Sequence, residues 1–149
     1  MVVNLLNEVY LFKGLNENEL RLLERIAVVL PVNEGEVIFH QGALADSFYV
    51  IQYGSVRVEQ KISSNLPVEL TTLGAGDHFG EMAMLDDTPR SATVTALQNS
   101  NIICFKYFAI ETLLKSQPRI YAHFYRQLSC SQSHRLRATT LRFSSLRTL

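Results

Sequence analysis

The sequence predicts a mainly β fold flanked by helices, and three observations support that class. Between residues 31 and 106, short runs rich in Val, Ile, Phe, Tyr and Thr alternate with turns, and six of the seven glycines lie there. Before and after this region, apolar residues recur at helical spacing. Many short strands at close spacing are typical of a β-sandwich or a jelly-roll barrel.

The first part of the chain, residues 1–30, is expected to be helical. Asn16 followed by Glu19 has the pattern of a helix N-cap with an acid in the first turn. Four apolar residues follow at roughly helical spacing, namely Leu20, Leu22, Leu23 and Ile26. The pattern also fits an earlier short helix over residues 4–10, with Gly14 breaking the chain between the two helices.

The second part, residues 31–106, is expected to form the β region. In the run SVRVEQKI, Val56 and Val58 alternate with Arg57 and Glu59, which predicts a strand with one face in water. The six expected strands are EVIF (36–39), SFYVIQ (47–52), SVRVEQKI (55–62), PVELTTL (67–73), ATVTAL (92–97) and NIICFK (101–106).

Helices are expected again in the third part, residues 107–149. The run YFAIETLLKS has Phe108, Ile110, Leu113 and Leu114 on one broad side, and Pro118 should end this helix. A second helix should begin near Arg119, with the apolar stripe Ile120, Phe124 and Leu128. Residues 129–133, SCSQS, have poor helix propensity, so the prediction of helix weakens beyond them.

Composition and charge exclude several classes of protein. The chain of 149 residues is 47% hydrophobic and 19% charged, which suits one folded domain rather than a disordered protein. It has no apolar run near the ~20 residues of a membrane span, and no secretory signal is recognised at the N-terminus. The two cysteines, Cys104 and Cys130, lack metal-ligand spacing. A cytoplasmic protein with reduced thiols is therefore expected.

The net charge of zero conceals an uneven distribution. Residues 1–111 hold seven basic and 14 acidic residues, a net charge of −7, whereas residues 112–149 hold seven basic residues and no acid, a net charge of +7. A basic tail of this kind can bind nucleic acid or an anionic surface. It can equally lie against its own acidic domain, and this second interpretation is the favoured one.

The stretch FGEMAMLDDTPRSATV, residues 79–94, combines the features of an anion site. A strand is expected to end at Phe79, and Gly80 allows the backbone to turn or to approach a ligand closely. A short helix over residues 81–85 would begin with unpaired N–H groups, which attract anions. Arg90, held in place by Pro89, adds a planar set of donors that matches phosphate oxygens.

Glu81 has two alternative interpretations in this stretch. A carboxylate repels phosphate, so a functional Glu81 would accept a hydrogen bond from a neutral hydroxyl nearby, such as a ribose 2′-hydroxyl. In the structural alternative, Glu81 is favoured at a helix N-terminus by the helix dipole, and Arg90 is paired with Asp86 or Asp87.

The whole stretch resembles the phosphate-binding cassette of cyclic-nucleotide-binding domains. That family includes catabolite-activator regulators, regulatory subunits of cyclic-AMP-dependent kinase and cyclic-nucleotide-gated channels. The matching residues are Phe79-Gly80-Glu81, the small and apolar turn Met82-Ala83-Met84-Leu85, and Pro89-Arg90-Ser91-Ala92. The resemblance extends over about residues 5–128. It implies an eight-stranded jelly-roll β-barrel (a double-stranded β-helix) with N-terminal and C-terminal helices, all in one cyclic-nucleotide-binding domain.

The resemblance also implies a role for each cassette residue. Arg90 would pair with the cyclic phosphate, backbone N–H groups at Ala83 and Ser91 would bind its oxygens, and Gly80 and Glu81 would face the ribose. The predicted ligand-binding residues are therefore Gly80, Glu81, Met82, Ala83, Arg90, Ser91 and Ala92.

Further residues are predicted to bind the base. Val58 and Leu73 would line the base pocket, and Gln132 and Arg135 of the C-terminal helix would reach the base as a lid. In the family, threonine near the position of Ser91 often favours cyclic GMP, so serine here favours cyclic AMP, with cyclic GMP as the alternative.

Neither catalysis nor a metal site is predicted. His40, His78, His123 and His134 have no metal-ligand spacing, no nucleophile and base are paired, and His78 is expected in a turn or a core contact. We therefore expect no enzyme, no cofactor and no metal.

The expected function is that of a regulatory, signal-transducing module. Binding of a cyclic mononucleotide, cyclic AMP before cyclic GMP, would be relayed through the C-terminal helices to an unknown protein effector. The helix from Arg119 onward would pack on the barrel or form a homodimer seam. The chain ends about 30 residues after Pro118, too few for a DNA-binding domain. The alternatives are an interaction domain that binds no nucleotide, and the sensor part of a longer transcription regulator.

Overall fold

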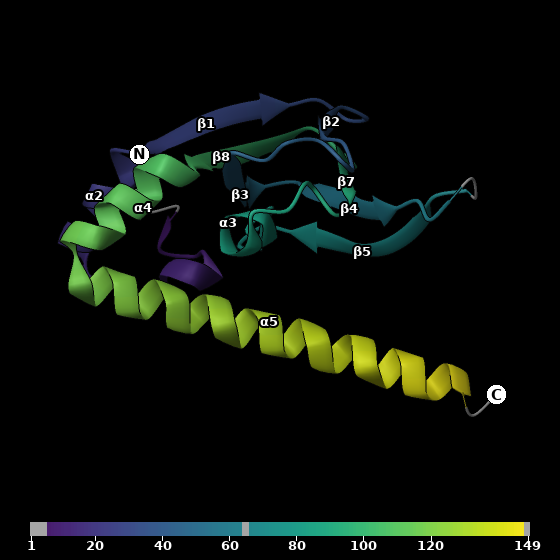
Figure 1. The fold of residues 1–149 in the computed structure, drawn as a ribbon. Helices are drawn as coiled ribbons and strands as arrows, with labels where there is room; N and C mark the ends of the chain where they lie inside the picture. Colours follow the sequence, from purple (N-terminus) through teal and green to yellow (C-terminus); the bar gives the residue numbers. More distant parts are fainter. Residues whose placement is uncertain (1–5, 64–65, 148–149) are drawn as a thin grey trace.

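The computed structural model describes residues 6–63 and 66–147, which form two antiparallel sheets with helices packed at one end and a long C-terminal helix running along the sheets (Figure 1). The strand order is β1-β8-β3-β6 in one sheet and β2-β7-β4-β5 in the other. The strands are β1 (Ala27–Val32), β2 (Val37–Phe39), β3 (Ser47–Tyr53), β4 (Ser55–Gln60), β5 (Val68–Gly74), β6 (His78–Phe79), β7 (Thr93–Ala96) and β8 (Ser100–Lys106). The helices are η1 (Tyr10–Phe12, a 3₁₀ helix), α2 (Glu17–Glu24), α3 (Met82–Asp86), α4 (Tyr107–Ser116) and α5 (Pro118–Arg147). The mainly β, eight-stranded class is confirmed for the described residues.

All six expected strands are present, but the expected helical state of residues 1–30 is wrong at its end. Residues 27–30 belong to β1, which pairs with β8 from Ala27↔Phe105 to Val32↔Ser100. Val28 and Val29 suit a strand, and Pro31 is tolerated because β1 lies at the edge of its sheet. This segment is a strand because it pairs with β8, which lies about 70 residues further along the chain.

The helices bury an aromatic core against the end of the first sheet. Phe48 of β3 and Phe105 of β8 stack with ring centroids 5.1 Å apart, and Phe124 of α5 lies 5.8 Å from Phe48. The predicted stripe of α5 is buried in full, at Ile120, Phe124 and Leu128. Phe108, expected on the apolar side of α4, is instead 83% exposed, because it precedes buried Ile110 by only two residues and so lies on the other side of the helix.

Helix α5 runs without a break through residues 129–133 to Arg147, although the sequence prediction of helix weakens beyond those residues. Ser129 Oγ donates to the carbonyl of Tyr125 within the helix, and Ser131 is buried with its Oγ 3.2 Å from His78 Nε2. Serine is unfavourable in a helix mainly where it competes for backbone groups. Between residues 128 and 135, packing of one face against the domain offsets that weak propensity.

The N-terminal segment is held between the barrel and α5. Residues 4 and 5 of the expected helix over residues 4–10 lie outside the described residues; the expectation is wrong for residues 7–9, which form a turn and a bend before η1 begins at Tyr10. Gly14 has φ +91°, and a Cβ there would lie 2.6 Å from His123 Cε1 of α5. Gln127 Nε2 donates to the Tyr10 carbonyl at 3.0 Å, and His123 Nε2 contacts the Lys13 carbonyl. Glycine at position 14 thus permits the close approach of α5.

Replacing Asn16 with alanine is expected to lower the free energy of unfolding by about 1 kcal/mol. The predicted N-cap is present as a capping box: Asn16 Oδ1 accepts from Glu19 N–H, and Glu19 Oε1 accepts from Asn16 N–H, both at 2.9 Å. Urea unfolding followed by circular dichroism measures the change. The matched control is Asn7→Ala at an exposed position, and equal stability of the two variants would contradict the role of the cap.

Candidate functional site

One pocket lies between the cassette and the second sheet, and encloses about 620 Å³ including its open mouth. All seven predicted ligand-binding residues line it, together with Val58, Leu73 and Arg135, whereas Gln132 does not. The lining residues are Phe39, Val58, Thr71, Leu73, Phe79, Gly80, Glu81, Met82, Ala83, Pro89, Arg90, Ser91, Ala92, Val94 and Arg135. Apolar strand residues thus form one part of the pocket, and the cassette supplies its polar groups.

The cassette backbone turns sharply at Gly80, and two residues that line the pocket have N–H groups unpaired within the described ranges. Gly80 has φ +85°, and a Cβ there would lie 2.8 Å from Arg90 Nη1 and 3.3 Å from the Phe39 ring. Glycine is therefore required both by conformation and by space. The N–H groups of Ala83, in the first turn of α3, and Ser91 have no hydrogen-bond partner within the described part of the chain.

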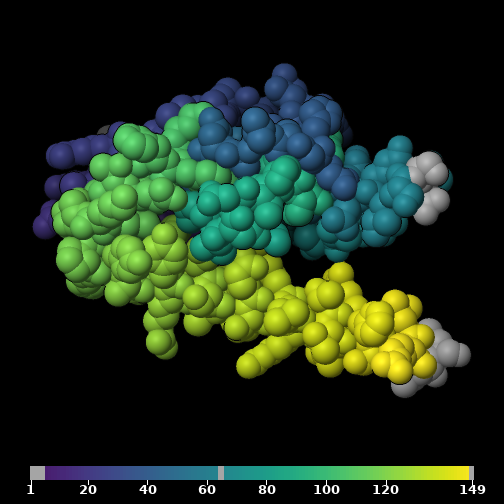
Figure 2. All heavy atoms as spheres, viewed as in Figure 1, coloured from purple at the N-terminus to yellow at the C-terminus, as the bar shows by residue number. Residues whose placement is uncertain are grey.

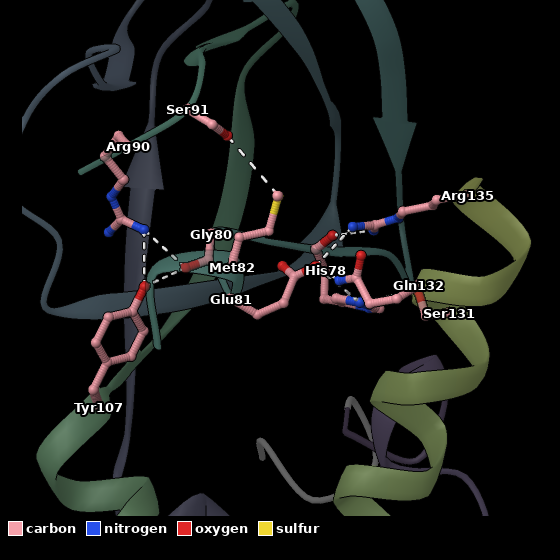
Figure 3. Close-up of polar contacts among 10 residues, drawn as sticks. All are labelled: His78, Gly80, Glu81, Met82, Arg90, Ser91, Tyr107, Ser131, Gln132 and Arg135. Atoms are coloured by element: carbon pink, nitrogen blue, oxygen red, sulfur yellow. Dashed lines mark hydrogen bonds and ion pairs between the residues drawn. The ribbon is translucent and has the colours of Figure 1, made fainter. Parts of the chain in front are cut away.

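Arg90 is only 5% exposed, and its guanidinium is bound by carbonyl and hydroxyl groups (Figure 3). Nη1 donates to the Gly80 carbonyl at 2.9 Å and to Tyr107 Oη at 3.1 Å, and Nη2 donates to the Ser47 carbonyl at 2.7 Å. The guanidinium carbon lies 4.0 Å from the centre of the Phe39 ring, a cation–π contact. Nε is buried and has no partner among the described atoms.

No carboxylate pairs with Arg90 among the described residues, so the alternative pairing with Asp86 or Asp87 is wrong. Asp86 instead accepts hydrogen bonds from the backbone and the hydroxyl of Thr88, and Asp87 ends α3 in the left-handed conformation with φ 55°. Burying a cation without a paired anion costs free energy, and an anionic ligand bound beside Arg90 would lower that cost.

The Glu81 carboxylate points toward α5 rather than capping α3 (Figure 3). Its Oε1 accepts from Gln132 Nε2 at 2.7 Å and from Arg135 Nη1 at 2.8 Å. The residue is 1% exposed, and Oε2 has no partner among the described atoms. Glu81 does stand at the N-terminus of α3, as the dipole alternative expects, but its side chain makes no capping hydrogen bond within the described structure. The predicted lid residues do reach the cassette, but the structure has them bound to this carboxylate.

His78 is a buried core contact beside Glu81, as expected. Its Nε2 lies 3.2 Å from Ser131 Oγ and 3.7 Å from Glu81 Oε1. Burial, and then the nearby Arg135 guanidinium, lower the pKa of His78 to about 3. His78 is accordingly neutral at pH 7, and its contact with Glu81 is not an ion pair at that pH.

Acidification is expected to destabilise the protein through His78. The unfolded chain takes up a proton at the ordinary pKa of 6.5, whereas the folded chain does so only near pH 3. Between these values the unfolded state binds more protons, so stability falls as the pH falls, by up to about 1.4 kcal/mol per pH unit. Urea unfolding at pH 7.5 and pH 5.0 measures this slope. It should become shallower in His78→Gln and stay unchanged in the exposed control His134→Gln; equal slopes in both variants would contradict the assignment.

Three residues that organise the site were not predicted. Phe39 and Tyr107 contact Arg90, and Ser47 supplies a backbone carbonyl to it. They lie 17 to 51 positions from Arg90 in the sequence. The contact of Ser47 is made by its backbone carbonyl, which every residue type has, so the residue type at position 47 does not predict it. Within the described ranges, no cluster of His, Cys, Asp and Glu could hold a metal ion, and no helix is long and apolar enough to cross a membrane.

The fold and pocket define a ligand-binding jelly-roll domain with a buried arginine at its polar end. Residues 29–117 match the family model described as "Cyclic nucleotide-binding domain". This match covers more than half of the chain, and the chain therefore belongs to the cyclic nucleotide-binding domain family.

The relatives in this family include proteins named for either nucleotide. The chain is 42% identical over 100 residues to cGMP-dependent protein kinase, isozyme 1, of Drosophila melanogaster, covering 64% of this chain and 13% of the kinase. It is 35% identical over 91 residues to the cAMP-dependent protein kinase regulatory subunit of Blastocladiella emersonii, covering 61% of this chain and 23% of the subunit. The chain thus spans less than a quarter of the length of either relative.

Solved structures agree on the fold. The catabolite activator protein of Thermus thermophilus is 28% identical with a TM-score of 0.81, covering 93% of this chain and 63% of that chain. The regulatory domain of Toxoplasma gondii PKA, crystallised with cAMP, is 27% identical with a TM-score of 0.75, covering 90% of this chain and 49% of that chain.

Proposed function

We propose that this chain binds a cyclic mononucleotide in the cassette pocket and relays its occupancy through α5. The observation that carries the proposal is the convergence of unpartnered polar groups on one pocket. Arg90 Nε, Glu81 Oε2 and the N–H groups of Ala83 and Ser91 have no partner within the described residues, and all four residues line the pocket. Polar groups without partners are costly where they are buried, as they are at Arg90, Glu81 and Ala83, and a cyclic nucleotide would satisfy all four groups.

Each part of the ligand has a matching surface. The cyclic phosphate would lie between Arg90 and the two N–H groups, with its charge balanced by the guanidinium. The ribose would lie at Gly80, with its 2′-hydroxyl donating to Glu81 Oε2. The base would contact Val58 and Leu73 on β4 and β5, which face the same pocket.

Cyclic AMP is the proposed ligand. Ser91 is exposed and its Oγ lies 3.9 Å from Met82 Sδ, at the edge of the pocket. In related domains threonine near this position often favours cyclic GMP through its hydroxyl and the guanine amino group, and serine or alanine is more usual where cyclic AMP binds. The relatives are named for both nucleotides, so this preference rests on Ser91 alone, and Ser91→Thr should raise the affinity for cyclic GMP relative to cyclic AMP.

The relay to α5 is proposed to pass through Glu81. The same carboxylate that would receive the ribose hydroxyl holds Gln132 and Arg135 of α5. A ligand that binds Glu81 changes the strength of these contacts, and so favours one position of α5 over another by its difference in affinity for the two. A protein effector that contacts α5 would read this change.

A homodimer through α5 is the second proposal, and the exposed apolar side chains of this helix favour it. Three of them, Leu136, Phe143 and Leu146, are spaced by seven and then three residues, and the face in view in Figure 2 leaves the C-terminal part of α5 open to solvent. The exposed members are Tyr121, Leu136, Leu141, Phe143 and Leu146. Analytical ultracentrifugation should show a dimer that Leu136→Glu dissociates; a monomeric wild-type protein would refute the dimer.

Calorimetric titration with cyclic AMP and cyclic GMP, on protein stripped of copurified ligand by unfolding and refolding, tests the main proposal. We expect the protein to bind one molecule of cyclic AMP per chain, with a higher affinity than it has for cyclic GMP. Absence of binding of both nucleotides at millimolar concentration would instead favour an interaction domain without a nucleotide. The sensor role in a longer transcription regulator would be tested on the full gene product by a DNA-binding assay with and without cyclic AMP.

A further inference from the structure

The carbonyl of Gly80 accepts hydrogen bonds from two donors at once. Arg90 Nη1 donates to it at 2.9 Å, and the hydroxyl of Tyr107, at the start of α4, also donates to it (Figure 3). Arg90 Nη1 also donates to the same hydroxyl oxygen at 3.1 Å. Gly80, Arg90 and Tyr107 therefore form a closed triangle of hydrogen bonds behind the pocket.

Tyr107 is well fixed and keeps its proton. Its backbone N–H donates to the Asp46 carbonyl at 2.8 Å, and the side chain of the preceding Lys106 pairs with Asp46 Oδ2 at 2.9 Å. Burial raises the pKa of Tyr107 to about 12. The hydroxyl therefore remains a donor at neutral pH, aimed at one carbonyl.

This triangle affects how Arg90 would receive a phosphate. Its two terminal nitrogens are bonded to carbonyls, at Gly80 and Ser47, and only Nε lacks a partner among the described atoms. A phosphate bound to two guanidinium nitrogens would have to draw one of them from its carbonyl. A buried carbonyl that loses its donor carries a desolvation cost. The Gly80 carbonyl avoids that cost because Tyr107 still donates to it, whereas no second donor reaches the Ser47 carbonyl among the described residues.

We infer that Tyr107 is a positioning residue for the phosphate site: its hydroxyl holds the Gly80 carbonyl so that Arg90 Nη1 is released to the ligand. This inference rests on the proposed function. It also gives α4 a direct link to phosphate occupancy, because Tyr107 is the first residue of that helix.

The test is Tyr107→Phe, which removes the hydroxyl and keeps the ring. Cyclic-AMP affinity should fall by about tenfold, because phosphate and the Gly80 carbonyl then compete for Arg90. Stability without ligand should change little, since Arg90 still donates to that carbonyl. The matched control is Tyr53→Phe, which removes a hydroxyl from a half-exposed tyrosine of β3 outside the pocket.

A double-mutant cycle with Arg90→Lys separates positioning from a structural role. Tyr107→Phe should weaken binding in the wild-type background and have almost no further effect once Arg90 is lysine. Unchanged affinity of Tyr107→Phe would overturn the inference. Additive losses in the cycle, accompanied by an equal loss of stability without ligand, would overturn it as well. If the wild-type protein binds neither nucleotide, the proposed function itself has failed.

Discussion

Arg90→Lys is expected to weaken cyclic-nucleotide binding by about 100-fold or more, although lysine keeps the positive charge. Arginine presents several N–H donors in a fixed plane, and here that plane lies on the Phe39 ring. It bonds the Gly80 and Ser47 carbonyls while Nε stays unpartnered within the described structure. A single ammonium group cannot contact both carbonyls and a phosphate in that geometry. Calorimetric titration of the variant with cyclic AMP measures the loss.

Lysine is a cleaner replacement than alanine at this position. Alanine would leave the buried Ser47 carbonyl without its donor and open a space beside Phe39, so a loss of stability would accompany the loss of binding. Urea unfolding without ligand checks that Arg90→Lys remains folded. Arg57→Lys on β4 is the matched control, since Arg57 pairs with Glu59 and does not line the pocket. Affinity of Arg90→Lys within threefold of the wild type would reject the assignment of Arg90.

Elements with strong local signals were predictable from the sequence. The capping box at Asn16 and Glu19 fixes the start of α2 through contacts three residues apart, and α4 occupies the expected residues 107–116. Strand β1 was missed because its state depends on β8, which is distant in sequence. The continuation of α5 through residues 129–133 was missed for the same reason, since Ser131 is stabilised by packing against His78, whereas residues 136–147 beyond it are exposed.

In the candidate site, too, residues of a local motif were predictable, whereas contacts between distant parts of the chain were not. The seven predicted residues lie in one continuous stretch, so a local motif was sufficient to bring them to one pocket. Predicting Tyr107 would have required knowing that the start of α4 lies behind Gly80. Gln132 and Arg135 were expected to reach the base, but they bind Glu81. The sequence indicated that α5 approaches the cassette, and only the structure identifies the atoms that it contacts.

Glu81→Gln is expected to remove discrimination between cyclic AMP and its 2′-deoxy analogue. A hydrogen bond to a charged carboxylate contributes about 1.5–3 kcal/mol, so the wild-type protein should prefer the ribose form by about 10- to 150-fold. Glutamine has the same shape but is neutral, and its amide group can direct an N–H where Oε2 now lies. The ratio of the two affinities should therefore fall below about threefold in the variant. Competition binding with both analogues measures this ratio.

The same substitution should loosen α5, because Arg135 would lose the anion that it now binds at 2.8 Å. Amide hydrogen exchange without ligand should become faster over residues 128–136 of α5, since opening of the helix there costs less. Arg135→Ala separates the two roles of Glu81: it should also speed exchange in α5 yet preserve discrimination against the 2′-deoxy ligand. Arg142→Ala, which removes a contact of α5 with the Leu70 carbonyl outside the pocket, is the control for exchange. Discrimination that survives in Glu81→Gln would show that Glu81 serves α5 alone and does not recognise the sugar.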